Sequence, residues 1–206
     1  MKKILVIALA LFAGAQAHAQ LVADGGYAHA MESVRYENGG INFKHSATLD
    51  GVYLGARYVF SLDNLVNGLA VAPGANLSYL FGKYWDYESC KVRELAINVP
   101  VQAMYTYDFG RDFKVFGLAG PILQLGLSHK AKDSNSGTQY DLYNKDNHLG
   151  FGRRPFNVYM GLAAGIQVAD MIQVSVGFDF GLCNLASTNY YKLGRNVLKI
   201  GVGYVF

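Results

Sequence analysis

Charged residues are scarce in this chain of 206 residues. Asp, Glu, Lys and Arg together make up 16% of it, whereas hydrophobic residues make up 51%. Disordered chains combine low hydrophobicity with high charge, so disorder is excluded. Lys and Arg exceed Asp and Glu by three, but Lys2 and Lys3 lie in a segment that we expect to be removed. The remaining net charge of +1 predicts no nucleic-acid partner.

A long hydrophobic run is also missing. After residue 19 no stretch supplies the roughly 18 unbroken apolar residues of a membrane-spanning helix. The chain is rich in glycine and aromatic residues instead, with 24 Gly, 15 Tyr and 12 Phe. Its length suits a single domain and argues against a two-domain enzyme. This composition favours a β-barrel in a membrane.

The first 19 residues have the three-part pattern of a secretory signal peptide. Lys2 and Lys3 precede an apolar stretch at residues 4–13, and a small-x-small motif ends at Ala19. We therefore expect cleavage before Gln20, which leaves residues 20–206 as one barrel domain. The alternative, an anchor helix, is disfavoured because the apolar stretch is too short to cross a bilayer.

The remaining sequence divides into eight segments with alternating polarity, each bounded by turn residues. They cover residues 22–34, 50–60, 69–81, 93–109, 113–129, 155–168, 171–183 and 196–206. A tilted strand of roughly 9 to 11 residues crosses a membrane, so each segment is long enough. The pattern predicts an all-β fold, an eight-stranded antiparallel up-and-down transmembrane β-barrel. An even number of strands places both termini on one side.

The connections between these segments alternate in length. Residues 61–68, 110–112 and 169–170 form short links, whereas residues 35–49, 82–92, 130–154 and 184–195 form longer polar loops. Outer-membrane barrels combine short periplasmic turns with long extracellular loops. We therefore expect both termini in the periplasm.

Alternation predicts which side chains contact lipid. In residues 171–183, Val174 and Val176 share one face, and Ser175 and Asp179 share the other. A soluble sandwich or lipocalin-like barrel gives the same alternation with its apolar face inward. Aromatic residues gather at both ends of the segments, as two membrane interfaces require, and favour the membrane barrel. Residues 113–129 are apolar on both faces, so we expect a bulge or bend near Gly120 and Pro121.

Two groups of segments resemble known outer-membrane proteins. The chain ends in IGVGYVF, and its Tyr204 and Phe206 resemble the terminal strand signal that the barrel-assembly machinery recognises in such proteins. The segments GVYLGARYVFSL, GLAVAPGANLSYLFG, ELAINVPVQAMYTYDFG and FKVFGLAGPILQLGLS resemble, in order and spacing, the porin-like outer-membrane β-barrel domain family of Gram-negative bacteria. This resemblance implies a fold and a location in the bacterial outer membrane, but little about a ligand.

Several charged side chains are predicted to face the lumen. They are Asp24, Glu32, Arg57, Glu94, Asp108, Lys114, Asp179 and Lys199. Eight strands enclose only enough room for side chains, so we interpret these charges as a plug of ion pairs. The alternative is a polar path for small solutes.

Two further pairs of residues are candidates for specific roles. Arg153 and Arg154 begin a strand at the outer leaflet, where guanidinium groups pair well with lipid phosphates; the alternative is an ordinary solvated loop. Cys90 and Cys183 both lie at the extracellular side, where a disulfide can persist. The sequence leaves open a bridge between them or two separate thiols.

No catalytic, cofactor or metal site is predicted. The loop histidines lack ligand spacing, and neighbouring Ser128 and His129 point to opposite faces of a strand. We therefore expect a non-enzymatic structural or surface-interaction protein that contacts outer-membrane lipid and an extracellular ligand through its loops. A narrow channel and a lipid-directed enzyme, with His29 or His129 and an unknown partner, are the alternatives.

Overall fold

The computed structural model describes residues 19–38, 41–83, 90–110, 113–134, 136–144, 152–187 and 191–206. The predicted signal peptide lies almost entirely outside these ranges and stays a prediction. The strands are β1 (Ala19–Asn38), β2 (Ile41–Ser61), β3 (Leu69–Lys83), β4 (Cys90–Asp108), β5 (Phe113–Asp133), β6 (Gln139–Asp141), β7 (Phe156–Val168), β8 (Ile172–Gly181) and β9 (Tyr191–Val205). Within the described residues no helix is long and apolar enough to span a membrane.

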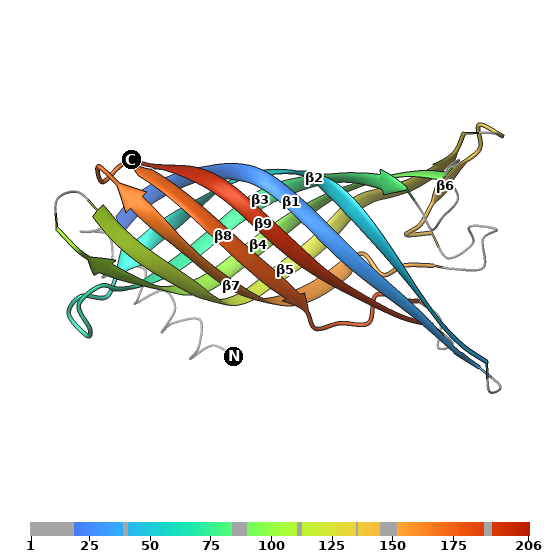
Figure 1. The fold of residues 1–206 in the computed structure, drawn as a ribbon, viewed down its shortest axis with the longest axis horizontal. Coiled ribbons are helices and arrows are strands. Elements are labelled where there is room, and N and C mark those ends of the chain that lie inside the picture. The colour runs from blue at the N-terminus through green and yellow to red at the C-terminus, as the bar shows by residue number, and fades with distance from the viewer. Residues whose placement is uncertain are drawn as a thin grey trace, which may run out of the picture.

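Eight antiparallel strands close into a barrel (Figure 1). Each strand pairs with its neighbours along the chain, and β1 closes the ring against β9, with Val22 opposite Val205. The short strand β6 pairs only with β5 and stands outside the ring. Closure pairs both edges of every ring strand, which a sheet in hydrocarbon requires. The predicted eight-stranded up-and-down barrel is confirmed.

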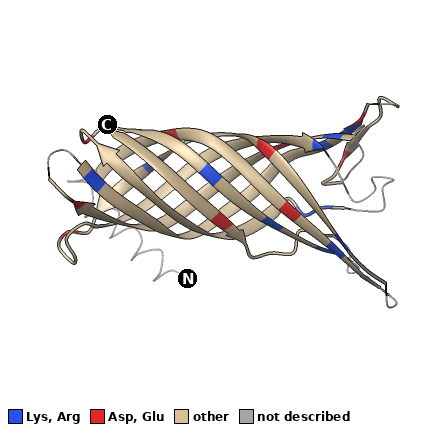
Figure 2. Cartoon of the chain, in the orientation of Figure 1, with Lys and Arg blue, Asp and Glu red and all other residues tan. Residues whose placement is uncertain are grey.

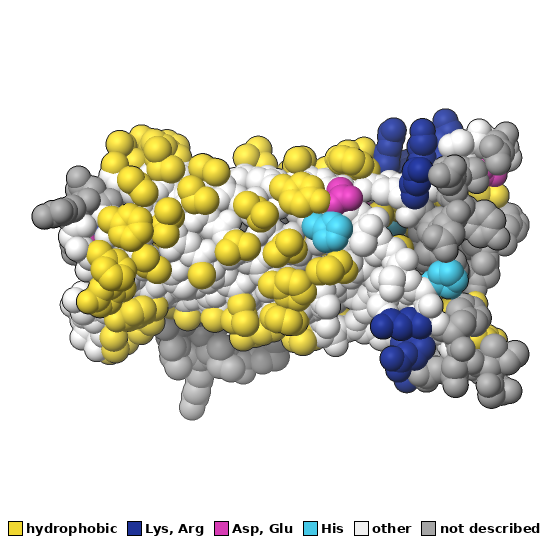
Figure 3. All heavy atoms as spheres, in the orientation of Figure 1, with side chains coloured by type: hydrophobic (Ala, Val, Ile, Leu, Met, Phe, Trp, Pro, Cys, Tyr) yellow, Lys and Arg dark blue, Asp and Glu magenta, His cyan; other side chains and the backbone are white. Residues whose placement is uncertain are grey.

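The apolar rows face outward and the polar rows face inward. On β8, Val176 is 52% exposed, whereas Gln173 and Asp179 are buried. The exposed hydrophobic side chains form a band around the wall (Figure 3). This arrangement excludes the soluble alternative, in which the apolar rows would meet in the centre.

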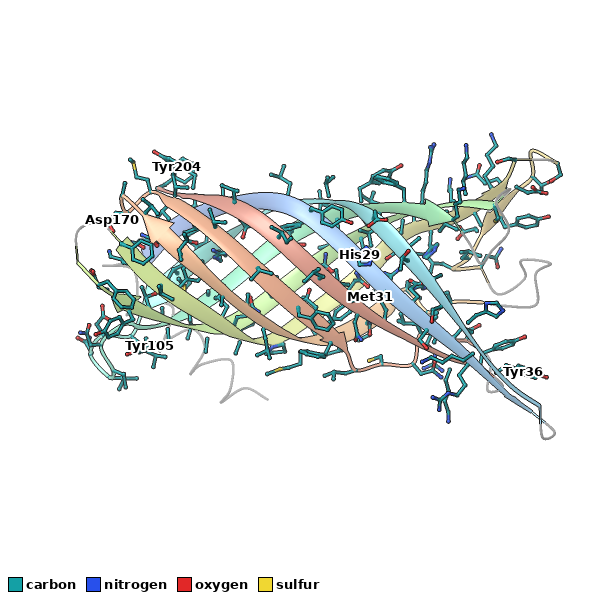
Figure 4. The ribbon with its side chains drawn as sticks, in the orientation of Figure 1. His29, Met31, Tyr36, Tyr105, Asp170 and Tyr204 are labelled. Atoms are coloured by element: carbon teal, nitrogen blue, oxygen red, sulfur yellow. The ribbon has the colours of Figure 1, made fainter. Side chains whose placement is uncertain are left out.

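Aromatic side chains surround the barrel at the end that holds the C-terminus (Figure 4). The rings of Tyr204 and Phe206 lie 4.9 Å apart, and those of Tyr107 and Phe109 lie 4.8 Å apart, all on exposed side chains. This is the expected girdle at the turn end. Several aromatics of the expected second girdle lie outside the described residues: Tyr84, Trp85, Tyr87, Phe151 and Tyr190.

Two connections differ from the sequence prediction. Most of the loop expected at residues 35–49 is an extension of β1 and β2, which continue to pair up to Asn38 and Ile41. The loop expected at residues 130–154 contains the rest of β5 and strand β6. Polar residues in these stretches concealed the strands, because beyond the bilayer neither face of a strand needs to be apolar.

The bulge in β5 lies beyond the place where the sequence predicts a bulge or bend. The β4–β5 register shifts where Ala96 pairs with Gly126 and Leu95 pairs with Ser128, so Leu127 is the extra residue. Near Gly120 and Pro121 the ladder is interrupted without any shift of register. A bulge re-aims the side chains that follow it. Residues with even numbers face inward before Leu127, whereas His129 and Ala131 face inward after it.

The interior is filled by side chains in layers. One apolar layer contains Met104, Phe116 and Leu118, and another is built around Tyr53 and Tyr159. Apolar groups inside the barrel explain why β5 looks apolar on both faces. The layers separate the charged groups into distinct clusters.

Candidate functional site

Five buried side chains form an ionic network between the walls of the barrel. Glu32 on β1 accepts hydrogen bonds from Arg153 at 2.6 and 3.0 Å and from Nε of Arg195 at 2.6 Å. Arg195, on β9, also donates two hydrogen bonds to Glu94 on β4, both of 2.5 Å. The Nδ1 atom of His129, on β5, lies 2.7 Å from Glu94 Oε2. All five side chains are at most 5% exposed.

The charges of this network balance. Two guanidinium groups face two carboxylates, so the charges of these four side chains sum to zero. Planar guanidinium groups pair with carboxylates in two parallel hydrogen bonds, as Arg195 does with Glu94 and Arg153 does with Glu32. The network therefore crosslinks β1, β4 and β9 with the segment before β7.

The segment after β6 extends the sheet beside the network. The backbone N–H of Leu142 donates to the carbonyl of His129 at 2.8 Å, and that of Arg153 donates to the carbonyl of Leu142 at 2.9 Å. Leu142 is 1% exposed, and the ring of Tyr143 meets the His129 ring edge-on with centroids 5.6 Å apart. Burial raises the pKa of the Tyr143 hydroxyl above its ordinary range. Together these residues enclose the network on the side of His129.

Two more ion pairs lie deeper in the lumen. Arg57 is 2.5 Å from Asp24 and also hydrogen-bonds Gln173. Lys199 is 2.6 Å from Asp179, and its ammonium group lies 5.7 Å from the centre of the Tyr53 ring. The structure therefore places Arg57, Asp179 and Lys199 in the interior with opposite charges beside them.

Lys114 and Asp108 lie at the turn-end rim, Lys114 lining the lumen there and Asp108 exposed to solvent. Lys114 Nζ is 2.6 Å from Asp170, a residue of the short β7–β8 turn, and 3.9 Å from Asp108. The carboxylate of Asp108 is 59% exposed. The lumenal placement of Asp108 is wrong because the strand has already reached solvent at that residue.

Arg153 does not face lipid. The sequence suggested a lipid phosphate as its partner, but its guanidinium is 3% exposed and pairs with Glu32. The segment before β7 turns inward through a bridge between Arg153 and Ala186, which carries the side chain into the mouth. Arg154 is exposed, so its pairing with a phosphate stays a prediction.

The two cysteines are free thiols. Cys90 begins β4 and Cys183 follows β8, and strands β5 and β7 lie between these two strands in the ring. A disulfide requires Cα atoms within about 7 Å, whereas neighbouring strands alone are about 4.8 Å apart. Of the two alternatives that the sequence left open, the structure therefore has the separate thiols.

Sequence reasoning missed Arg195, which joins both carboxylates of the network. It was assigned to a loop, although it continues the inward alternation of Val197 and Lys199 by one further step. Extending that alternation would have identified it. The partners of His129 had no comparable signal, because the bulge at Leu127 reverses the facing of the residues after it.

A polar cluster also lies on the outer wall. His29 Nδ1 is 2.7 Å from Asp50, and the Tyr27 hydroxyl hydrogen-bonds the same carboxylate. A catalytic pair of this kind needs a nucleophile within reach of the imidazole. Among the described residues, no Ser, Thr or Cys side chain hydrogen-bonds His29. In the same ranges, no three His, Cys, Asp or Glu side chains are grouped as metal ligands.

The open space inside the barrel is divided. A cavity of about 300 Å³ opens at the turn end, lined by residues such as Lys114, Gln167 and Gln173. A smaller space of about 70 Å³ lies between the Asp24 and Asp179 ion pairs. The buried network lies beyond both spaces, towards the long loops.

Comparisons with known proteins identify the fold. No protein-family model matches the chain, and no curated protein matches its sequence. Neisserial surface protein A is 17% identical with a TM-score of 0.50, covering 91% of this chain and 97% of that one. Ail of Yersinia pestis is 16% identical (TM-score 0.41; 92% and 99% covered), and the protease OmpT of Escherichia coli is 9% identical (TM-score 0.44; 91% and 96% covered).

The similarity to Neisserial surface protein A shows the fold alone. An identity of 17% says nothing about a shared activity. The chain has the fold of small outer-membrane β-barrels. The resemblance to the porin-like family is therefore supported for the fold.

Proposed function

We propose that this protein is a non-enzymatic barrel of the bacterial outer membrane with a sealed interior and a structural or surface-interaction role. The ionic network of Glu32, Glu94, His129, Arg153 and Arg195 carries this proposal, because it fills the mouth with paired charges that are hardly exposed. Opening a water path there requires separating ion pairs that are already desolvated. Leu142, in the segment after β6, belongs to the apolar cluster around Tyr53 and Tyr159 that also fills the interior.

In the proposed orientation the strand ends at Ala19 and Phe206 face the periplasm. The β2–β3 and β7–β8 connections lie at this end, and the β1–β2 and β5–β6 hairpins project from the other (Figure 1). The exposed Tyr204 and Phe206 would be available to the barrel-assembly machinery during insertion. An extracellular ligand would contact the projecting hairpins.

Conductance measurements test the sealed interior. Purified protein inserted into planar bilayers is expected to give no discrete openings, because the network blocks the mouth. A sixteen-stranded porin inserted in the same way provides the positive control, since barrels of that size conduct. Stepwise currents from this protein would support the narrow-channel alternative instead.

Labelling of intact cells tests the orientation. We replace Cys90 and Cys183 by serine and introduce Ser136→Cys in the β5–β6 hairpin or Asn64→Cys in the β2–β3 turn, both at exposed positions. A membrane-impermeant maleimide is expected to label the variant at residue 136 in intact cells and the variant at residue 64 only after lysis. The opposite labelling pattern would mean that the barrel has the opposite orientation in the membrane.

The structure offers limited support for an enzyme. The His29–Asp50 pair supplies a base and an acid on the lipid-facing wall. It lacks a hydrogen-bonded nucleophile within the described ranges, so we do not propose lipid hydrolysis.

A further inference from the structure

Five cations stand next to one another on the outer wall at the loop end. Lys83 on β3 pairs in register with Lys91 on β4, and Lys91 pairs with Lys132 on β5. Two residues further along β4, Arg93 pairs with Lys130 on β5. All five side chains are exposed, and we call them the basic patch. Figure 2 shows the blue residues gathered near β6.

This arrangement is unfavourable within the protein alone. Directly opposite side chains of neighbouring strands have Cβ atoms about 5 Å apart, and like charges there repel. No salt bridge joins a patch residue to an acidic group among the described residues. The nearest carboxylate in register is Asp141, opposite Lys130. Five positive charges therefore face outward with one acidic neighbour in register.

The bulge at Leu127 contributes to the patch. Without the extra residue, Lys130 and Lys132 would keep the inward facing of Gln124 and enter the lumen. With it, both lysines face outward while His129 turns inward to Glu94. A single bulge thus places the lysines outside and completes the ionic network inside.

The patch begins where the apolar band ends. On β3 the exposed apolar residues Tyr79 and Phe81 are followed by Lys83 on the same face. On β5, Leu125 and Leu127 precede Lys130 and Lys132 in the same way. Strands rise about 3.3 Å per residue, so Lys83 lies about 7 Å along the strand from Phe81. Figure 3 shows dark-blue side chains directly beside the yellow band.

A second group of exposed cations is arranged in the same way across neighbouring strands. Arg35 on β1 lies opposite Lys44 on β2 and Lys192 on β9, again on exposed side chains. Outward cations therefore stand near the loop ends of β1, β2, β3, β4, β5 and β9. A ligand that occurs all around the barrel at the boundary of the hydrocarbon fits this placement better than a single soluble molecule.

We propose that the basic patch binds the phosphate groups of the outer-leaflet glycolipid, lipopolysaccharide. Its acyl chains would lie against Phe81, Leu125 and Leu127, and its phosphorylated sugars would lie at the height of the lysines. Lysine is a flexible point charge that can follow phosphates held at varying positions. Anionic head groups next to a membrane attract each such cation, and bound phosphates would remove the repulsion between the lysines.

Binding of purified lipopolysaccharide to the folded protein in a neutral detergent tests the proposal. The test does not depend on the orientation in the cell, so it can fail independently of the proposed function. A triple variant, Lys83→Gln, Lys91→Gln and Lys132→Gln, is expected to bind on the order of 100-fold more weakly. The triple Lys→Arg variant at the same positions is expected to retain binding, because it keeps the charge.

Two controls separate this site from other effects. Lipopolysaccharide stripped of its phosphates is expected to bind the wild-type protein as weakly as the intact lipid binds the triple Gln variant. Lys114→Gln removes a cation at the opposite rim and is expected to leave binding unchanged. The altered electrophoretic mobility of heated samples confirms folding of each variant. Equal binding of intact lipid by the wild type and the triple Gln variant, or of both lipids by the wild type, would overturn the proposal.

Discussion

Replacing Arg195 by methionine is expected to lower the free energy of unfolding of the barrel by about 3 to 5 kcal/mol. Arg195 is 2% exposed and bonds both Glu32 and Glu94. Its removal leaves two buried carboxylates opposite a single guanidinium, that of Arg153. A buried charge without a partner destabilises the fold by more than an intact ion pair stabilises it. Removing one partner of a buried pair is therefore strongly destabilising.

Equilibrium unfolding in urea, with the protein in lipid vesicles, measures this effect. Arg154→Met serves as the matched control, because Arg154 is exposed and is expected to change stability by less than about 0.5 kcal/mol. A double variant, Glu94→Gln with Arg195→Met, is expected to recover part of the loss, since it removes the excess negative charge. Equal stabilities of the Arg195 and Arg154 variants would mean that the network does not hold the walls together.

The sequence was sufficient to predict the barrel because a strand in a membrane obeys one strict rule. Successive side chains of a strand point alternately to the lipid and to the lumen. Val176 and Asp179 could therefore be assigned to opposite faces without coordinates. The same rule located Arg57 and Lys199 inside, where each meets a carboxylate of another strand. Which carboxylate each one meets depends on strand register, and the sequence alone does not specify it.

The rule fails where the chain leaves the hydrocarbon or where the alternation is broken. Arg153 and Arg195 lie in segments that look like polar loops, although both side chains turn inward. His129 follows the bulge at Leu127, and no single residue type marks that bulge. The central ionic network was therefore the part of the candidate site that sequence reasoning could least predict, because tertiary contacts build it.

The basic patch was missed for a related reason. In the sequence, Lys83, Lys91 and Lys132 are separated by a loop and by an entire hairpin, and each looks like an ordinary solvated lysine. Only the register of β3, β4 and β5 places them in one row. The sequence-based hypothesis of lipid-phosphate binding therefore named Arg153 and Arg154, whereas the proposed patch consists of residues on the wall.

Placing arginine at Val176 is expected to destabilise the inserted barrel by about 2 to 4 kcal/mol, the cost of a cation on the lipid face near the bilayer midplane. Val176 is 52% exposed in the middle of β8, with Val174 and Phe178 on the same face. Within the described strands β7, β8 and β9 no carboxylate faces outward, so the guanidinium must reach towards an interface. Unfolding in urea from lipid vesicles measures the loss.

Ser175→Arg provides the matched control one residue away. Ser175 faces the small space between Asp24 and Asp179, where the new charge would lie beside two carboxylates that each already pair with one cation. We expect a milder loss there, although the added volume exceeds the free space and keeps the change from being neutral. If Ser175→Arg lowered the free energy of unfolding more than Val176→Arg, the side chains of β8 that we place towards lipid would instead face the lumen. Because β8 pairs with both β7 and β9, the facing of its neighbours would then be reversed as well.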